Sequence, residues 1–311
     1  MKDKIIIIVG PTAVGKTALS IELAKEFNGE IISGDSMQVY KKLDIGTAKV
    51  TIEEAKDIPH YLIDIKEVND NYSAADFKKE AKSIIKSITN NGKIPIIVGG
   101  TGLYIESLIY NVSHGGKADP DFEFRNAMEA LANDNGRKLL WDRLNKIDPK
   151  AAEKIHPNNL VRVIRALEVP HVTGELFSTY QKERDNKELI YDPYIIGLNT
   201  DRELLYERIN KRVNLMIDDG LLVEAKWLME QANPDAQSTK GIGYAELIDY
   251  FNEQISLECA IDSIKQNSRQ YAKRQLTWFR NRMPVTKWYD LVQEIDDIDQ
   301  VKKDVRQFLK G

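Results

Sequence analysis

Residues Gly10 to Thr17 read GPTAVGKT and fit the pattern G-x-x-x-x-G-K-[ST]. In this pattern glycines allow a tight turn, and backbone N–H groups at a helix start point at phosphate oxygens. Lys16 reaches a terminal phosphate, and the Thr17 hydroxyl can bind Mg²⁺. The stretch predicts a phosphate-binding loop whose default ligand is a nucleoside triphosphate. Its predicted ligands are Gly10, Pro11, Thr12, Ala13, Val14, Gly15, Lys16 and Thr17.

A carboxylate follows the loop in the stretch SGDSMQVY, where a second predicted strand ends near Asp35. A carboxylate at a strand end that faces a phosphate loop can bind Mg²⁺ or act as a general base. The plainer alternative is an Asx turn, in which the side chain only bonds its local backbone. We favour the functional interpretation and take Asp35 as a candidate catalytic residue.

A third candidate site is the stretch VGGTGLY, which follows another predicted strand. An ATPase commonly ends such a strand in an aspartate that holds Mg²⁺ and orients water. This strand ends in Gly-Gly-Thr instead, although Asp64 in HYLIDI leaves a Walker-B-like role open. Thr101 is a candidate for binding a phosphate or a base, and its alternative role is to cap the next helix.

Two arginine pairs have helical spacing: Arg162 with Arg165, and Arg208 with Arg212. Such pairs clamp phosphates in many phosphate-loop proteins, and a solvated helix face is an equally good explanation for either pair alone. Arg208 and Arg212 are the candidates for contact with the phosphate ligand. The histidines have no ligand spacing and are assigned no metal; they are His60, His114, His156 and His171.

The elements that must position these residues alternate between strands and helices. KIIIIVG is a continuous apolar run, typical of a parallel strand covered on both faces, and strands recur at GEIIS, HYLIDI and IPIIV. The segment 112–192 has helical periodicity with turn signals at SHGGKADPD and NDNG, and DPYIIGLN restores a strand. We predict an α/β fold: a parallel sheet of the P-loop NTPase type with flanking helices, made of residues 1–111 and 193–311. A helical insertion at 112–192 and a helical C-terminal region complete it.

The composition, with 42% hydrophobic and 30% charged residues among 311, is that of a soluble globular protein. The sequence has no run long enough to span a membrane, and the single cysteine, expected to be buried, favours the cytosol. The net charge is −4, yet residues 263–288 contain seven basic and no acidic residues, interleaved with aromatic ones. A local basic and aromatic surface suits one polyanionic partner. We expect a monomer.

Taken together, several stretches resemble the tRNA dimethylallyltransferases, also called tRNA isopentenyltransferases. They are GPTAVGKT, SGDSMQVYKKLDIGTAK, IPHYLIDI, VGGTGLYIESL, NNLVRVIRALEV, ERINKRVNLMIDDGLLVEA, KGIGYAEL and RQYAKRQLTWFR. The resemblance runs from residue 5 to about residue 288 and is of the bacterial type, without the eukaryotic zinc finger. One departure is EVPHVTG, where the family usually has aromatic residues after ALEV. Pro170 and His171 put the local backbone there in question, not the activity.

The resemblance implies transfer of a dimethylallyl group from dimethylallyl diphosphate to N6 of the adenosine just 3′ of the anticodon, in tRNAs that read codons beginning with U. The loop then holds the donor's diphosphate, with Mg²⁺ at Thr17, and Lys16 neutralises the leaving group. Asp35 accepts a proton from N6 of the flipped adenine, and Thr101 contacts the transfer site. The implied tRNA contacts are Asp35, Ser36, Met37, Gln38, Thr101, Asn159, Leu160, Val161, Arg162 and Val163, with Lys273 and Arg274 gripping the anticodon stem-loop.

Two other functions remain open on the residues alone. A small-molecule P-loop kinase needs the loop, Mg²⁺ and an arginine-bearing lid, but not the basic stretch at 263–288. A nucleotide-gated RNA-binding module without catalysis needs neither Asp35 nor Thr101. ATP turnover with and without tRNA distinguishes the kinase from the transferase.

Overall fold

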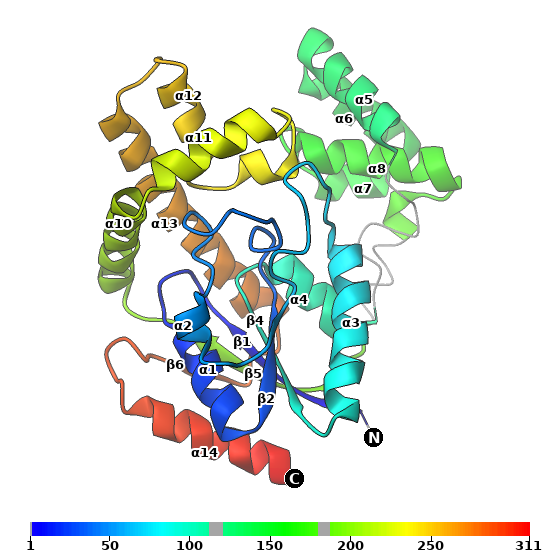
Figure 1. The fold of residues 1–311 in the computed structure, drawn as a ribbon. Helices are drawn as coiled ribbons and strands as arrows, with labels where there is room; N and C mark the ends of the chain where they lie inside the picture. Colours follow the sequence, from blue (N-terminus) through cyan, green and yellow to red (C-terminus); the bar gives the residue numbers. More distant parts are fainter. Residues whose placement is uncertain (1, 112–120, 180–186) are drawn as a thin grey trace. The chain divides into compact units, whose positions relative to one another are not determined.

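The strand that leads into the phosphate loop lies inside a six-stranded, all-parallel sheet with the order β3-β2-β4-β1-β5-β6 (Figure 1). The computed structural model describes residues 2–111, 121–179 and 187–311. The strands are β1 (Lys4–Val9), β2 (Gly29–Ser33), β3 (His60–Tyr61), β4 (Ile94–Gly99), β5 (Asp192–Leu198) and β6 (Lys287–Tyr289). The predicted α/β class with a parallel sheet is confirmed.

The central position of β1 in the sheet explains why its sequence is a continuous apolar run. Ile5 to Val9 have no exposed surface, because β4 pairs with β1 on one side and β5 on the other, while helices cover both faces. A strand buried on both faces has no polar alternation, which accounts for its continuous apolar run. Since all strands are parallel, the loops that follow β1, β2, β4 and β5 lie at the same edge of the sheet.

Two strands differ from the sequence-based prediction. The strand expected over HYLIDI is only the two residues of β3, because Leu62 (φ 63°) and Asp64 (φ 56°) adopt left-handed conformations that end it. The C-terminal third, predicted as helical, also contains β6, which pairs in parallel with β5. Gly197 makes room for this strand, since a Cβ there would lie 2.6 Å from the Trp288 ring.

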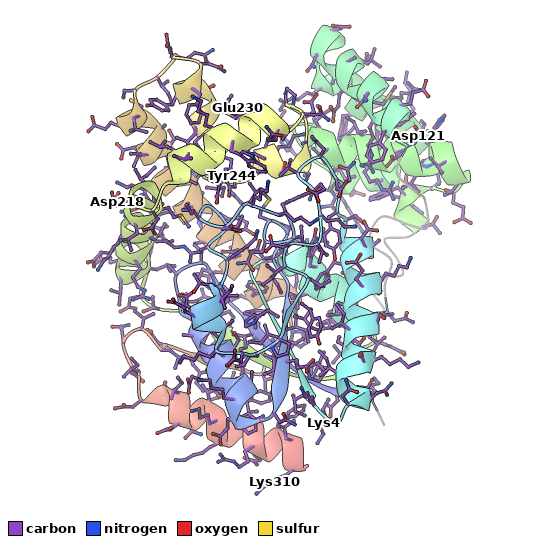
Figure 2. The ribbon with its side chains drawn as sticks, viewed as in Figure 1. Lys4, Asp121, Asp218, Glu230, Tyr244 and Lys310 are labelled. Carbon is purple, nitrogen blue, oxygen red and sulfur yellow. The ribbon has the colours of Figure 1, made fainter. Side chains whose placement is uncertain are left out.

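Helices enclose the sheet. In residues 2–109 and 190–311 the helices are α1 (Lys16–Glu26), α2 (Ile52–Ala55), α3 (Ala74–Asn90), α4 (Gly102–Ile109), α10 (Arg202–Asp218), α11 (Leu221–Gln231), α12 (Leu247–Phe251), α13 (Leu257–Arg282) and α14 (Asp297–Lys310), with a 3₁₀ turn, η1, at Gln237–Lys240. Helix α14 packs beside α1 (Figure 1). Lys4 donates to the carbonyls of Phe308 (2.9 Å) and Leu309 (3.2 Å), which ties the end of α14 to β1 (Figure 2). A cation at these carbonyls also complements the helix dipole.

The chain divides into two units by its internal contacts: Met1–Ile109 with Ile190–Gly311, and Tyr110–Leu189. The insertion predicted at 112–192 covers nearly the same segment as the second unit. Val112, His114 and most of the predicted SHGGKADPD turn lie outside the described residues. The helices whose bounds lie wholly among the described residues of the second unit are α5 (Phe122–Asn135), α6 (Arg137–Ile147), α7 (Pro149–Lys154) and α8 (Leu160–Thr173).

A buried carboxylate organises the second unit. Glu168 on α8 has no exposed surface and accepts hydrogen bonds from Arg125 at 2.7 and 2.9 Å, from Arg165, and from the Asp121 N–H at 2.7 Å. These donors hold the Glu168 pKa below its usual value against the effect of burial. Arg165, one of the arginines with helical spacing, therefore forms an ion pair with Glu168 inside the second unit. Helix α8 continues through Pro170 and ends at Thr173, so the departure at EVPHVTG is accommodated in its last turn.

Candidate active site

The phosphate loop follows β1 and turns sharply into α1. Gly10 (φ 151°), Ala13 (φ 68°) and Gly15 (φ 88°) have positive φ, and a Cβ on Gly10 would come within 2.4 Å of the Leu198 carbonyl oxygen. Helix α1 begins at Lys16 with no side-chain cap. An uncapped helix start leaves N–H groups and positive potential for an anion, so the geometry fits a bound phosphate.

Lys16 lies inside this loop. Its ammonium donates to the Pro11 carbonyl at 2.6 Å. Burial of the ammonium, followed by repulsion from Arg212, lowers its pKa to about 7, and the nearby Asp35 carboxylate only partly compensates. The Lys16 ammonium therefore loses its proton more easily than an exposed lysine, and a bound diphosphate would favour its charged form.

Helix α10 contributes both arginines predicted for the phosphate ligand. Arg208 donates from Nε to the Ala13 carbonyl at 2.8 Å, so it contacts the loop directly. Arg212, one turn later, is partly buried. Burial lowers its pKa, and the charge of Asp35 opposes that shift. The structure thus brings Lys16, Arg212 and Asp35 within electrostatic range of one another.

Asp35 follows β2. Its carboxylate accepts backbone hydrogen bonds and also faces Lys16 and Arg212. Its Oδ1 accepts the N–H of Met37 at 2.8 Å and of Gln38 at 3.4 Å, as in the Asx turn considered above. The local turn and the electrostatic contacts coexist. The turn fixes the carboxylate, which a general base needs.

Thr101 connects the loops that follow β2 and β4. Its Oγ1 accepts the Ser36 N–H at 3.0 Å and lies 3.3 Å from the Ser36 hydroxyl, while α4 begins at the next residue. Thr101 therefore does more than precede a helix, because its side chain fixes the segment that carries Asp35.

Helix α13 supplies site residues that the sequence analysis did not assign. Tyr271 is close to Asp35: burial and the Asp35 charge raise its pKa to about 12, offset in part by hydrogen bonds with Thr101 and Gln275. Gln275 lies over the phosphate loop and accepts the N–H of Thr12 at 3.2 Å. Tyr271 and Gln275 are four residues apart on one helical face, a spacing that could have suggested a shared contact. The Thr12 amide is thus already bonded within the protein.

A family model described as IPP transferase matches residues 38–282. The tRNA dimethylallyltransferase of Enterococcus faecalis (strain ATCC 700802 / V583) is 56% identical over 99% of this chain and 98% of its own length. That of Limosilactobacillus reuteri (strain DSM 20016) is 52% identical over 99% of each chain.

The chain belongs to the tRNA dimethylallyltransferase family.

Solved structures of this family have the same fold. The Bacillus halodurans tRNA isopentenylpyrophosphate transferase matches with a TM-score of 0.73 and 47% identity, over 99% of this chain and 97% of that one. A eukaryotic dimethylallyltransferase, described as acting on tRNA, matches with a TM-score of 0.76 and 34% identity, over 89% of this chain and 70% of that one. The family resemblance stated from the sequence is confirmed.

The RNA contacts implied by the family resemblance stay predictions, and the structure shows what two of these side chains contact within the protein. The Gln38 amide is occupied: it accepts from Ser33 at 2.9 Å and donates to the carbonyls of Thr47 (3.2 Å) and Ala48 (3.3 Å), so it holds its own segment in place. Val163 has no exposed surface because it lies in the core of the second unit.

The other implied contacts have accessible side chains. Met37 is partly exposed and Val161 is 77% exposed. Asn159 caps α8 by accepting the Arg162 N–H at 3.4 Å. Lys273 and Arg274 are exposed on α13, where Arg274 lies over the Tyr271 ring at 5.7 Å.

Helix α11 fixes the segment that follows Asp35. The Glu224 carboxylate accepts the N–H groups of Asp44 (2.7 Å), Ile45 (2.8 Å) and Gly46 (2.9 Å), and the hydroxyl of Tyr244 at 2.6 Å. A carboxylate that accepts several backbone donors holds a loop firmly. This contact, between residues far apart in sequence, was not predicted.

Asp64, which left a Walker-B-like role open, is connected to the same segment through Lys49. It accepts from Lys49 at 2.5 Å, and Lys49 also bonds Asp44 at 2.8 Å and the Tyr40 carbonyl at 2.6 Å. The Lys49 side chain is only 5% exposed. Asp64 is therefore part of an ion pair that holds the loop, and the ATPase-like interpretation gains no support from it.

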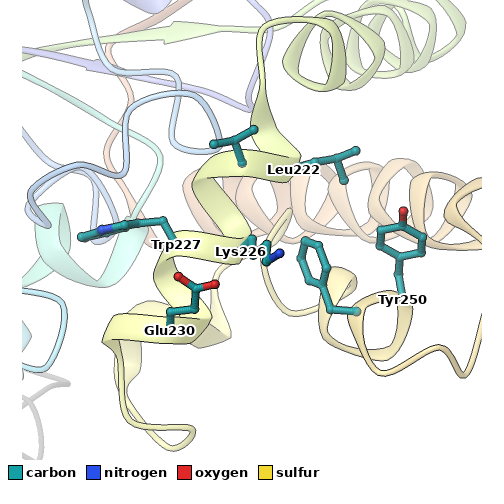
Figure 3. A pocket seen from close by; sticks show the side chains of 7 residues that line it. Leu222, Lys226, Trp227, Glu230 and Tyr250 are labelled. Atoms are coloured by element: carbon teal, nitrogen blue, oxygen red, sulfur yellow. The ribbon is translucent and has the colours of Figure 1, made fainter.

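Two hollows lie on the surface of the first unit. One, of about 470 Å³, is bordered by Arg202, Lys273 and Arg280 and adjoins the basic face of α13. The other, of about 330 Å³, lies at α11 and α12 and contains Trp227 and Tyr250 (Figure 3). The second contains no residue of the predicted site.

Cys259 is exposed, contrary to the expectation of a buried thiol, because it lies on the outer side of the first turn of α13.

Within the described ranges, no group of three or more His, Cys, Asp or Glu residues could hold a metal ion. None of the helices described is long and apolar enough to cross a membrane.

Proposed function

We propose that this protein transfers a dimethylallyl group from dimethylallyl diphosphate to N6 of the adenosine just 3′ of the anticodon in tRNAs that read codons beginning with U. Family membership supports the reaction class. The observation that carries the proposal is the meeting of an uncapped phosphate loop, an arginine pair and the Asp35 carboxylate at one edge of the sheet.

The donor side consists of the loop and α10. Backbone N–H groups at the start of α1 bind the diphosphate, and Lys16, Arg208 and Arg212 balance its charge. As the allylic C–O bond breaks, the leaving oxygen gains negative charge, so these cations stabilise the transition state more than the ground state.

Mg²⁺ fits the chemistry of this loop, and Thr17 is the residue that would hold it. Its side chain is exposed at the second residue of α1, beside the loop. Mg²⁺ in such sites takes few protein ligands and several phosphate oxygens. When bound, the ion supplies charge neutralisation to the diphosphate.

The acceptor side consists of Asp35 and Thr101. The N6 amino group attacks the allylic carbon, the C–O bond breaks, and diphosphate leaves with the bonding electrons. The proton lost from N6 passes to the carboxylate of Asp35, which its turn holds in place. The adenine must leave the stacked anticodon loop to reach this point, and exposed Lys273 and Arg274 would bind backbone phosphates.

Incubation with unmodified tRNA and radiolabelled dimethylallyl diphosphate tests the proposal. We expect label in the tRNA, release of diphosphate and no requirement for ATP. A tRNA with guanosine in place of the target adenosine is the matched control and should remain unlabelled. If ATP is consumed while no label enters tRNA, the P-loop kinase interpretation replaces this one.

A further inference from the structure

Gln275 lies where two loops of the candidate active site meet. Its side chain, on α13, is buried, with the residue only 5% exposed. Its Oε1 accepts the N–H of Thr12 in the phosphate loop at 3.2 Å, and its Nε2 donates to the carbonyl of Gly100 at 3.1 Å. One amide thus links the loop after β1 to the turn after β4.

The fit around this amide is close. A Cβ on Gly100 would lie 2.1 Å from Nε2 of Gln275, so the contact requires glycine at that position. Tyr271, one helical turn earlier, lies beside both Gln275 and Thr101. Because the amide oxygen needs a donor and the amide nitrogen an acceptor, these two bonds give the amide one favourable orientation, and it fixes both loops at a set spacing.

We propose that Gln275 is a positioning residue for the transfer reaction. Its amide holds the phosphate loop at the spacing from Thr101 that the donor and the acceptor need. The inference rests on the proposed function, which places the diphosphate in the loop and the adenine near Thr101. Gln275 acts through Thr12 and Gly100, and neither substrate needs to contact it.

Three variants separate this role from simple packing. Gln275→Met keeps the side-chain length but removes both hydrogen bonds. Gln275→Glu keeps the acceptor and regains a donor only when its carboxyl is protonated, which burial favours by raising the pKa of such a group. Gln266→Met changes an exposed glutamine on the same helix and is the matched control.

Binding of inorganic diphosphate with Mg²⁺, measured by calorimetry, reports on the loop without requiring prenyl transfer. We expect Gln275→Met to bind about 10- to 100-fold more weakly than wild type at every pH, since two buried groups lose their partners. Single-turnover transfer should fall as well, with tRNA affinity and the Gln266→Met variant unchanged.

The pH dependence of Gln275→Glu provides the sharper readout. At pH 8 its carboxylate cannot donate to Gly100, and we expect weak diphosphate binding. At pH 5.5 it should bind diphosphate more tightly than Gln275→Met, because both side chains are then neutral and only the acid can donate and accept. If Gln275→Met does not fold, Gln275→Asn, whose shorter arm cannot reach both loops, should show the same weak binding.

Two results overturn the proposal. One is wild-type diphosphate affinity in Gln275→Met with only a lower melting temperature, which would make Gln275 a packing residue. The other is equal affinity of Gln275→Glu and Gln275→Met at pH 5.5. Failure of the wild-type protein to label tRNA, with the diphosphate results intact, would instead refute the proposed function and leave the positioning of the loop supported.

Discussion

Lys16 is expected to make diphosphate binding depend on pH. Burial and then the charge of Arg212 lower its pKa to about 7 in the ligand-free protein, with Asp35 partly compensating. A bound diphosphate adds negative charge beside the ammonium, so the pKa of Lys16 rises in the complex. Above pH 7, binding must therefore take up a proton, and the affinity should fall as the pH rises.

The magnitude follows from the pKa. With a value of about 7, the ammonium is about 90% protonated at pH 6 and about 10% at pH 8. Each pH unit above 7 then weakens binding about tenfold, or about 1.4 kcal/mol, until the pH reaches the pKa in the complex. Between pH 6 and pH 9 the expected loss is about 100-fold.

The assay is calorimetric titration of inorganic diphosphate with Mg²⁺ into wild type and Lys16→Met from pH 6 to pH 9. The ratio of the two association constants cancels the ionisation of the ligand, which both proteins share. We expect this ratio to fall about 100-fold, with net uptake of about one proton near pH 8 detected in buffers of different ionisation enthalpy. A constant ratio without proton uptake would refute the conclusion that Lys16 is largely neutral above pH 7 before the ligand binds.

Three further changes test other parts of the structure. Asp35→Asn, which keeps the turn's acceptor, should slow single-turnover transfer about 10²- to 10⁴-fold without weakening tRNA binding; equal losses would make Asp35 a recognition residue. Neutralising Lys273 and Arg274 together should reduce the slope of log K against log salt by about 0.7–0.9 per lost phosphate contact. If filter binding shows the same salt dependence of the tRNA association constant as wild type, both side chains lie away from the RNA. Glu224→Ala should lower the free energy of unfolding in urea by about 1–3 kcal/mol, because the amides of residues 44–46 lose their acceptor; an unchanged midpoint would contradict this.

The sequence by itself determined the parts of this protein that depend on local pattern. The spacing of Gly10, Lys16 and Thr17 between an apolar strand and a helix specifies a phosphate loop, since each position has a backbone or charge requirement. Alternating strands and helices require a parallel sheet, and a parallel sheet brings strand ends such as Asp35 and Thr101 to one edge. The candidate site could therefore be outlined without coordinates.

Only the tertiary structure decided which distant side chains complete that outline. Thr12 and Gln275 are separated by 263 positions, and helical periodicity shows which face of α13 is buried but not what that face covers. The same limit applies to the contacts of Gln38, whose amide holds its own segment, and of Val163, which packs in the core of the second unit. β6 was missed because a three-residue strand depends on its pairing with β5 more than on its own sequence. Contacts of this kind are selected by the packing of the whole chain, so local pattern cannot specify them.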